Sequence, residues 1–409
     1  MNRYLIVADD FTGANDTGVQ LKRRGIPTSV VFSSGLIETD GSFVLDTESR
    51  ALGPEAAAAA VTAGLRGVDL RAFGRVMKKV DSTLRGSVAA EIQALDACYD
   101  SELVVFAPAL PDLGRTTVDG VHRLNGVPIT QTELARDPKN PVREDNLVKL
   151  LQAAYQEPVY HIPLGQVAAG AVDFSIGRVF TCDCVTNSDL QTILQAAAAT
   201  GRRTLWVGTA AMAEQLLNVE AQVPPALAVV GSVSEVTRRQ LHFASEAGHP
   251  LVLVSVPELL GGSQTPDVYA DQAVALLNQG QDVLLASSAS WDRGELDRSV
   301  SAGAAQGMDR TSVSDYTQHL LGQITRATLE RAAVSGLFLT GGDTALGFFR
   351  ATGSQGSSIL TEIVVGIPMM RLSGGPFSGL KLVTKAGAFG GEDAITLSLR
   401  KLKEVLPEP

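Results

Sequence analysis

The stretch Lys78 to Ser87 reads Lys-Lys-Val-Asp-Ser-Thr-Leu-Arg-Gly-Ser and joins a predicted strand to a predicted helix. The strand is the short run Arg75 to Val80, and the helix is Val88 to Ala97, where apolar residues recur at helical spacing. A loop between a strand and the next helix lies at the strand's carboxyl end, where open α/β sheets bind ligands. The alternative is a solvated turn in which Asp81 and Ser82 cap the helix.

The same succession of strand, polar loop and helix recurs through the first half of the chain. Tyr4 to Ala8 is typical of a strand buried on both faces, and Thr12 is the expected N-cap of the helix that runs to about Arg24. An irregular excursion, Val118 to Arg143, contains a predicted hairpin at Asn125-Gly126. Further strands are expected at Thr28–Phe32, Ser42–Leu45, Glu102–Ala107, Val179–Cys182 and Thr204–Val207. This alternation predicts an α/β fold with a mainly parallel sheet flanked by helices.

The second half repeats the alternation but replaces charged loops with glycine-rich turns. Val219 to Pro225 has no clear periodicity and is the expected linker, so residues 1–222 and 223–409 are predicted to form two α/β domains. Strands are expected at Leu227–Val230, Leu251–Val256, Val283–Ala286, Leu337–Leu339 and Leu382–Thr384. Three of them lead into the turns Gly231-Ser232, Gly341-Gly342-Asp343-Thr344 and Gly387–Gly391.

The composition is that of a globular protein and excludes several classes of function. The 409 residues carry a net charge of −10, from 34 Lys and Arg against 44 Asp and Glu, without a basic stripe for a nucleic-acid backbone. No apolar run of about 18 residues occurs, so no membrane partner is expected. The three cysteines form no disulfide or zinc pattern, and the N-terminus resembles a strand rather than a signal peptide. We therefore expect a cytoplasmic protein, with the oligomeric state left open, a homo-oligomer included.

The charged and hydroxyl groups of the first half suit a small sugar acid. They are Asp9, Asp10, Arg50, Lys78, Lys79, Asp81, Ser82, Arg85 and Arg115. Carboxylates accept hydrogen bonds from sugar hydroxyls, and Lys and Arg bind a carboxylate. The residues therefore predict a polar, anionic ligand that carries several hydroxyls.

The three glycine-rich turns of the second half suit phosphate groups. Glycine allows the backbone to approach a phosphate closely, and a helix N-terminus offers free amides and a positive dipole. The alternative is that each glycine only makes a tight turn. Three such turns in one domain favour phosphate binding.

A domain for a hydroxylated acid joined to a domain for phosphates predicts phosphoryl transfer across an interdomain cleft. Such chemistry uses in-line positioning, Mg²⁺ on the phosphates and a carboxylate that accepts the hydroxyl proton. The sequence contains neither a Walker Gly-x-x-x-x-Gly-Lys-[Ser/Thr] motif nor the protein-kinase motifs, so a kinase of another type is expected.

The sequence resembles the four-carbon acid sugar kinases, which phosphorylate threonate, erythronate and 3-oxo-tetronates. The resemblance covers nearly the whole chain and is carried by long motifs in a fixed order. These are Ala8–Ala14, Thr47–Arg50, Lys78–Gly86, Gly114–Gly120, Asp137–Val142, Gly341–Ala345 and Lys385–Gly391. It implies an N-terminal acid-sugar domain, a C-terminal ATP domain, and ATP with Mg²⁺ as cofactors, without identifying a protein site for the metal.

The resemblance also implies roles for individual residues. It implies that the sugar acid is bound by Asp9, Arg50, Lys79, Val80, Asp81 and Ser82, and that ATP is bound by Ser232, Gly341, Gly342, Asp343, Thr344 and Gly387. We add Asp10 and Arg85 to the predicted substrate set and Gly390 to the predicted nucleotide set. Asp81 or Asp9 is the expected catalytic carboxylate. Two alternatives stay open: Asp10 caps the first helix, and Arg85 bridges to Glu91 across a helix start.

The chain departs from the expected family forms Gly-Gly-Glu-Thr and Lys-Ser-Gly-Asn-Phe-Gly. Asp343 stands in the first, and Ala386 and Ala388 stand in the second. The shorter acid and the missing hydroxyl and amide bear on ATP affinity. The sequence does not specify which four-carbon acid or stereoisomer is bound.

Three other functions fit parts of the pattern. A dehydrogenase would need Gly-x-Gly-x-x-Gly after the first strand, where Asp-Asp-Phe-Thr-Gly-Ala stands instead. An aspartyl phosphatase would need Asp-x-Asp at the same place. A non-catalytic sugar-acid or nucleotide-binding protein is the third alternative.

Overall fold

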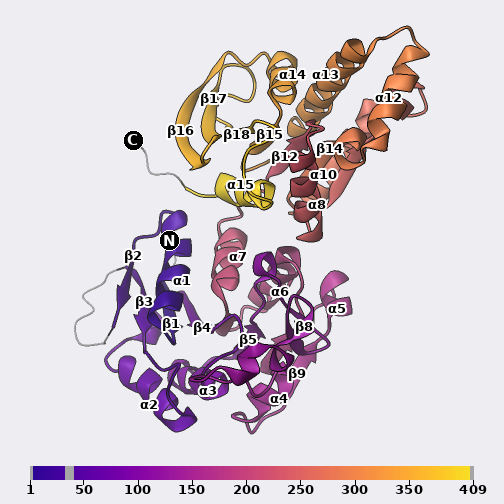
Figure 1. Cartoon of the computed structure of the whole chain (residues 1–409). Helices are drawn as coiled ribbons and strands as arrows, with labels where there is room; N and C mark the ends of the chain where they lie inside the picture. The colour runs from indigo at the N-terminus through magenta and orange to yellow at the C-terminus, as the bar shows by residue number, and fades with distance from the viewer. Residues whose placement is uncertain (1–2, 33–40, 406–409) are drawn as a thin grey trace. The chain divides into compact units, whose positions relative to one another are not determined.

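A computed structural model describes residues 3–32 and 41–405 (Figure 1). The chain divides into two compact units, with the boundary between Gln222 and Val223. No helix within the described residues is both long enough and apolar enough to cross a membrane.

The first unit is built on an eight-stranded sheet in the order β2-β3-β1-β4-β11-β5-β10-β9, and every neighbouring pair is parallel. Its strands are β1 (Tyr4–Ala8), β2 (Thr28–Val31), β3 (Ser42–Asp46), β4 (Arg75–Lys79), β5 (Leu103–Ala107), β9 (Val159–Ile162), β10 (Val179–Cys182) and β11 (Thr204–Gly208). A smaller antiparallel sheet contains β6 (Arg115–Val118), β7 (Val121–Leu124) and β8 (Val127–Pro128). The α/β prediction is confirmed.

Helices cover both faces of this sheet because successive strand residues point to opposite sides. On β1, Ile6 packs toward one core and Val7 toward the other. The first core involves α1 (Phe11–Arg23), α5 (Leu164–Ala168), α6 (Asn187–Ala199) and α7 (Ala210–Glu220). The second involves α2 (Pro54–Gly64), α3 (Val88–Tyr99) and α4 (Leu147–Gln152).

The second unit contains a seven-stranded sheet in the order β13-β14-β12-β15-β18-β17-β16. The strands are β12 (Leu227–Val230), β13 (Leu251–Val254), β14 (Val283–Ser287), β15 (Leu337–Thr340), β16 (Gly356–Val364), β17 (Ile367–Ser373) and β18 (Lys381–Lys385). The first four and β18 run parallel, whereas the hairpin β16–β17 is antiparallel. The sheet is therefore mainly parallel, as predicted, with an antiparallel edge.

Its helices also form two layers. One core contains residues of α9 (Val256–Leu260), α10 (Pro266–Asn278), α13 (Arg310–Leu329) and α14 (Gly342–Thr352). The opposite core contains residues of α8 (Glu235–Glu246) and α15 (Ala394–Leu402). The remaining helices are α11 (Ser288–Trp291) and α12 (Gly294–Ala304).

Local predictions had mixed outcomes. The hairpin at Asn125-Gly126 is confirmed, with both residues at positive φ between β7 and β8. The prediction of Thr12 as an N-cap is wrong, because α1 begins at Phe11 and the side chain of Asp10 accepts a hydrogen bond from the Gly13 amide at 3.0 Å. Asp10 has the extended backbone that an N-cap requires, whereas Thr12 already lies in the first turn.

Helices α13 and α14 pack at a glycine contact. A Cβ atom on Gly322 would lie 2.4 Å from the carbonyl oxygen of Gly347, and one on Gly347 would lie 2.3 Å from that of Gln318. Neither backbone oxygen can move without displacing its helix. The close approach therefore depends on both glycines.

We predict that Gly322→Ala lowers the free energy of unfolding of the second unit by about 1–3 kcal/mol, because the added methyl group overpacks this contact. The measurement is urea unfolding followed by the fluorescence of Trp291 in a Trp206→Phe background. Gly294→Ala is the matched control, since its Cβ would approach the Asp292 side chain no closer than the ordinary contact distance of 3.5 Å. Equal unfolding midpoints for the two variants would contradict the prediction.

Candidate active site

The first half-site gathers where β3, β1 and β4 end. These strands are neighbours in the sheet, so the loops after Asp46, Ala8 and Lys79 lie at one edge. From them come Arg50, the pair Asp9-Asp10, and Asp81. The sheet order therefore brings together residues that are more than 70 positions apart in the sequence.

Arg50 connects the carboxylates of this half-site. Its guanidinium donates to Asp9 from Nε at 2.6 Å and Nη2 at 3.1 Å, and to Asp10 from Nη1 at 2.7 Å and Nη2 at 2.6 Å. It also lies 3.6 Å from Asp81 Oδ1. Asp10 thus caps α1, which confirms the cap alternative, and it also pairs with Arg50.

The carboxylate of Asp81 accepts hydrogen bonds on both of its oxygens. Its Oδ2 accepts hydrogen bonds from the Thr83 amide at 3.1 Å and from Arg85 Nε at 3.0 Å, and its Oδ1 accepts from Arg85 Nη2 at 3.0 Å. Burial alone would raise the pKa of Asp81, but the hydrogen bonds from Arg85 and Thr83 hold it well below its usual range. Asp81 is therefore a stable carboxylate with little basicity.

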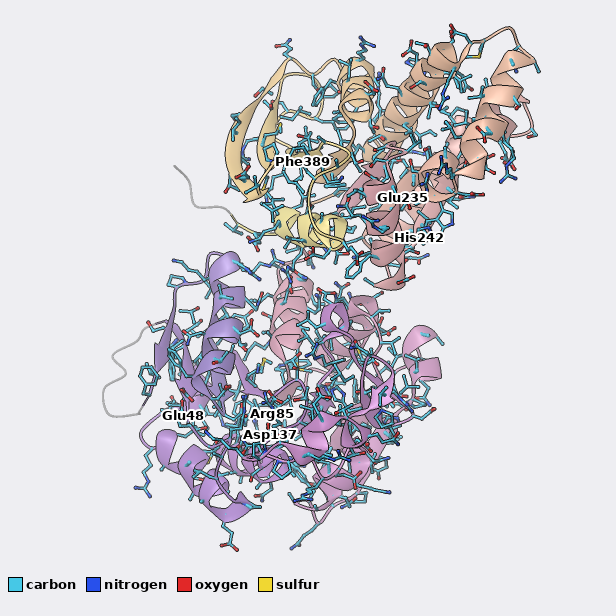
Figure 2. All side chains as sticks on the ribbon, in the orientation of Figure 1. Glu48, Arg85, Asp137, Glu235, His242 and Phe389 are labelled. Carbon is cyan, nitrogen blue, oxygen red and sulfur yellow. The ribbon has the colours of Figure 1, made fainter. Side chains whose placement is uncertain are left out.

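The proposed Arg85–Glu91 bridge is wrong. Arg85 pairs with Asp81 and lies 3.8 Å from Asp137, near which Figure 2 shows it. Glu91 instead pairs with Lys78 at 2.8 Å, and both side chains are buried. Glu91 lies in the first turn of α3, whereas Arg85 lies in the loop before that helix, and Glu91 reaches Lys78 on β4.

Lys79 stands apart from its neighbour Lys78. Successive strand residues point to opposite faces, so Lys78 turns toward α3 and Lys79 toward the start of α1. The Lys79 side chain is 5 % exposed, and its ammonium has no hydrogen bond or ion pair with any residue in the described ranges. Burial lowers the pKa of Lys79, and the charges of Asp9 and Asp81 act against that shift. A buried, unpaired cation is suited to an anionic ligand.

The absence of a side chain at Gly13 provides the space for the ammonium group of Lys79. A Cβ atom at Gly13 would lie 2.9 Å from Lys79 Nζ and 2.6 Å from Asp10 Oδ1. The other two members of the substrate set lie in the same loop: Val80 is buried, and Ser82 is half-buried. All eight predicted substrate residues therefore lie at this edge of the sheet.

His122 is a buried contact of this loop, and none of the sequence motifs includes it. It lies on β7, is fully buried, and its Nε2 is 3.0 Å from the Ser82 carbonyl oxygen. Burial lowers the pKa of His122 to about 4, although the Ser82 carbonyl and the charge of Asp81 act to raise it. No motif spacing marked His122, because its partner lies 40 residues away.

The second half-site forms where β12, β15 and β18 end side by side in the other sheet. A Cβ atom on Gly231 would lie 2.2 Å from Thr344 Oγ1, and one on Gly387 would lie 3.0 Å from Ser232 Oγ. Gly341 has a φ of +95°, which favours glycine, and precedes α14. The three glycine-rich turns therefore converge at one edge.

A pocket of about 470 Å³ opens from these turns toward α12 and α13. Its polar side contains Ser232, Gly341, Asp343 and Thr344. Its apolar wall is formed by Val256, Leu296, Val300, Val313 and Leu321. The volume lies within the range of small-molecule sites, and the division into polar and apolar sides suits phosphates beside a planar base.

The turn after β18 is fixed through the carbonyl oxygen of Gly387. This oxygen accepts hydrogen bonds from Ser234 Oγ at 2.8 Å, Thr237 Oγ1 at 3.1 Å and Lys385 Nζ at 3.1 Å. Burial lowers the pKa of Lys385 to about 8. These donors were not predicted as site residues, since their common partner is a backbone atom.

Gly390 has a different environment from the rest of the predicted nucleotide set. A Cβ atom there would lie 2.7 Å from Ala394 Cβ and 2.9 Å from Ile367 Cδ1. Its φ of +82° and these two contacts explain the glycine by packing. Gly342 and Asp343 are exposed at the start of α14, and Thr344 is buried beneath them.

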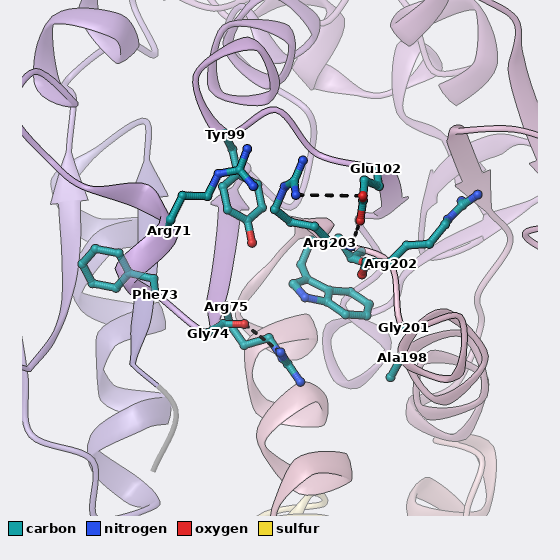
Figure 3. Close-up of a pocket in the computed structure, with 12 residues that line it drawn as sticks. Arg71, Phe73, Gly74, Arg75, Tyr99, Glu102, Ala198, Gly201, Arg202 and Arg203 are labelled. Atoms are coloured by element: carbon teal, nitrogen blue, oxygen red, sulfur yellow. Dashed lines mark hydrogen bonds and ion pairs between the residues drawn. The ribbon is translucent and has the colours of Figure 1, made fainter.

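Figure 3 shows another pocket of about 470 Å³, at the amino ends of β4 and β11 in the first unit. Four arginines line it: Arg71, Arg75, Arg202 and Arg203. Arg71 pairs with Asp100 at 2.9 Å, and Arg203 lies 4.0 Å from Glu102. This pocket contains no predicted site residue and lies at the edge of the sheet opposite the Arg50 cluster.

In the described part of the chain, the acidic residues of the first half-site pair with arginines rather than with one another around a metal ion. Within residues 3–32 and 41–405, no group of three or more His, Cys, Asp or Glu side chains is arranged to hold a metal ion. Asp9, Asp10 and Asp81 instead share arginine partners. Cys182 and Cys184 are buried free thiols, and burial raises the pKa of each.

Comparison with protein families matches both units. Residues 4–216 match the family described as a sugar-binding N-terminal domain, and residues 227–395 match the nucleotide-binding C-terminal domain. The two matches follow the same order as the two half-sites.

Known proteins are similar over nearly the full length. A D-threonate kinase from Salmonella typhimurium is 33 % identical, covering 98 % of this chain and 99 % of its own. A D-erythronate kinase from Heliobacterium modesticaldum is 30 % identical, covering 96 % and 95 %. A solved domain of unknown function from Bordetella bronchiseptica, a domain-swapped dimer with bound citrate, is 27 % identical with a TM-score of 0.55 over 99 % of this chain and 100 % of that one.

The buried pair Lys78–Glu91 supplies a stability prediction. We expect Lys78→Met to lower the free energy of unfolding of the first unit by about 3–5 kcal/mol, because Glu91 is left charged and buried without its partner. The double variant Lys78→Met/Glu91→Leu should recover at least half of this loss. The measurement is urea unfolding followed by Trp206 fluorescence in a Trp291→Phe background. A double variant less stable than the single one would contradict the explanation.

Proposed function

The chain belongs to the four-carbon acid sugar kinase family, and from this premise we propose that it transfers the terminal phosphoryl group of ATP to a hydroxyl of threonate, erythronate or a 3-oxo-tetronate. The observation that carries the proposal is the buried, unpaired ammonium of Lys79 beside carboxylates already paired with arginine. A sugar acid supplies the missing negative charge and presents hydroxyls to the carboxylates.

The proposed substrate contacts follow from the charges of the Arg50 cluster. Lys79 would bind the substrate carboxylate or the transferring phosphoryl group, and Asp9 and Asp10 would accept hydrogen bonds from substrate hydroxyls. Arg50 fixes both aspartates. The site thus recognises a short chain with an anionic end and hydroxyls close to it.

We assign the proton-accepting role to Asp9 and a positioning role to Asp81. Asp81 accepts hydrogen bonds from Thr83 and Arg85 on both carboxylate oxygens, and these bonds leave it weakly basic. Asp9 accepts only the two hydrogen bonds from Arg50 among the side-chain contacts of the described residues. Its remaining lone pairs can accept a hydroxyl proton as the phosphoryl group is transferred.

The glycine-rich turns would bind the phosphates of ATP. The backbone amides around Gly231, Gly341 and Gly387 and the N-terminus of α14 supply donors, and the pocket between α12 and α13 would receive the nucleoside. Mg²⁺ bound to the nucleotide would neutralise phosphate charge during transfer. Each unit supplies the binding groups for one substrate.

We also propose where the protein is located and that it self-associates. A cytoplasmic location is proposed from the sequence alone. Similarity to the domain-swapped Bordetella protein supports self-association of this chain as well.

We predict acid-dependent ADP release from purified protein given ATP, Mg²⁺ and a panel of D- and L-threonate, D- and L-erythronate and 3-oxo-tetronates. Lys79→Met should lower kcat/KM for the preferred acid by at least about 100-fold, because the unpaired cation is lost. Lys22→Met, at an exposed position, is the control. Full activity of Lys79→Met, or ADP release that is independent of every acid, would contradict the function.

The nucleotide half-site can be tested separately. Gly231→Ala should raise the KD for ADP by at least about tenfold, since the new Cβ displaces Thr344 from the converging turns. Isothermal titration with ADP and Mg²⁺ measures this effect, and Gly294→Ala is the control in the same unit. Unchanged ADP affinity would remove the Gly231 turn from the phosphate site.

A further inference from the structure

The hairpin β6–β7 is attached firmly to the main sheet of the first unit. Asp183, directly after β10, accepts hydrogen bonds from the amides of Asp119 and Gly120 at 2.9 Å each and from the Leu164 amide at 3.0 Å. Asp119 and Gly120 both have positive φ and form the two-residue turn of the hairpin. A buried carboxylate therefore fixes the turn.

A second attachment lies further along the hairpin. The backbone of Thr117 pairs with that of Cys184, with N–O distances of 2.9 and 3.0 Å in the two directions. The His122 amide donates to the Asp145 carbonyl at 2.8 Å. The backbone of His122 therefore has a defined position relative to the sheet.

The imidazole of His122 connects the hairpin to the substrate loop by a hydrogen bond. Its Nε2 lies 3.0 Å from the Ser82 carbonyl oxygen, and its Nδ1 lies 3.0 Å from Thr117 Oγ1. A carbonyl oxygen can only accept, so Nε2 bears the hydrogen, and the Thr117 hydroxyl donates to Nδ1. Both ring nitrogens have a partner, which fixes the tautomer and the ring orientation.

The Ser82 carbonyl belongs to the loop that supplies Lys79 and Asp81. The peptide that contains it continues into Thr83, whose amide and hydroxyl both donate to the Asp81 carboxylate. A change in the orientation of this peptide would move Asp81, and Asp81 orients Arg85. The hairpin thus has a direct route of hydrogen bonds to the acid half-site.

We propose that His122 is a positioning residue for the kinase reaction, which holds the Ser82 peptide and thereby the Lys79–Ser82 loop in the geometry that binds the sugar acid. The inference rests on the proposed function, in which this loop contacts the acid. The competing explanation is a buried histidine that contributes only to stability. The two explanations predict different kinetics when the Nε2–H donor is removed. A positioning role predicts a loss of kcat/KM for the acid with the KM for ATP unchanged, whereas a purely stabilising role predicts no such selective loss.

The test compares His122→Asn with His122→Gln. The Gln side chain can place an amide N–H near the position of Nε2, whereas that of Asn reaches only as far as Nδ1. We expect His122→Asn to lower kcat/KM for the acid by at least about tenfold with the KM for ATP within about twofold of wild type, and His122→Gln to recover most of that loss. Thermal midpoints and ADP affinity are measured on the same samples.

The outcomes separate the explanations. If both variants lose stability alike but keep wild-type kcat/KM for the acid, or if the KM for ATP rises as much as that for the acid, the positioning role is wrong. If Lys79→Met is fully active, the acid-binding loop and this inference are both wrong. If Lys79→Met is inactive and His122→Asn is normal, only the inference is wrong.

If His122→Asn does not fold, a second pair of variants at Thr117 tests the same connection. Thr117→Val removes the hydroxyl that fixes the imidazole tautomer, while Thr117→Ser retains it. We expect a loss of about threefold in kcat/KM for the acid in Thr117→Val alone, with an unchanged KM for ATP. Equal kinetics in the two variants would overturn the role of the Thr117–His122–Ser82 connection.

Discussion

The first unit depends on one arginine that binds two successive carboxylates. Arg50 follows β3 and reaches Asp9 and Asp10, which follow the neighbouring strand β1. Adjacent carboxylates repel each other and are costly to bury, and the guanidinium offsets both costs by pairing with each of them. Arg50 and Arg85 pair with Asp9, Asp10 and Asp81, whereas the cation of Lys79 lacks a direct partner among the described residues. This arrangement leaves one positive charge available to a ligand.

The two units use the same topology for different chemistry. In each, neighbouring parallel strands end at one edge and bring loops of distant sequence together. The first unit fills that edge with charged side chains, which can distinguish hydroxyls from carboxylates. The second uses backbone amides, and its glycines are required where a Cβ would strike Thr344 or Ser232. A phosphate has the same shape in every nucleotide, so backbone contacts suffice for it.

The sequence predicted most of the parallel strands and the charged loop, because buried strands and the residues that follow them have strong local patterns. It did not predict the edge strand β9, which is mostly half-buried, or the hairpin β16–β17, since β16 is largely exposed and lacks a continuous apolar run. The predicted first cap at Thr12 and the alternative pair Arg85–Glu91 were both wrong, because spacing alone does not say where a helix begins or which face it presents. His122 could not be predicted, since its role depends on a backbone oxygen 40 residues away.

The residues that depart from the expected family motifs are Ala386, Ala388 and Asp343. Their side chains do not determine the backbone shape of the turns in which they lie. Ala386 and Ala388 are exposed, and the carbonyl between them is held by Ser234, Thr237 and Lys385. Asp343 is exposed in the first turn of α14, where a carboxylate of either length interacts favourably with the helix dipole. The lost hydroxyl and amide can therefore remove contacts to a nucleotide without displacing the backbone donors. Phosphate binding through backbone amides tolerates such substitutions, whereas the acid half-site, which depends on charged side chains, does not.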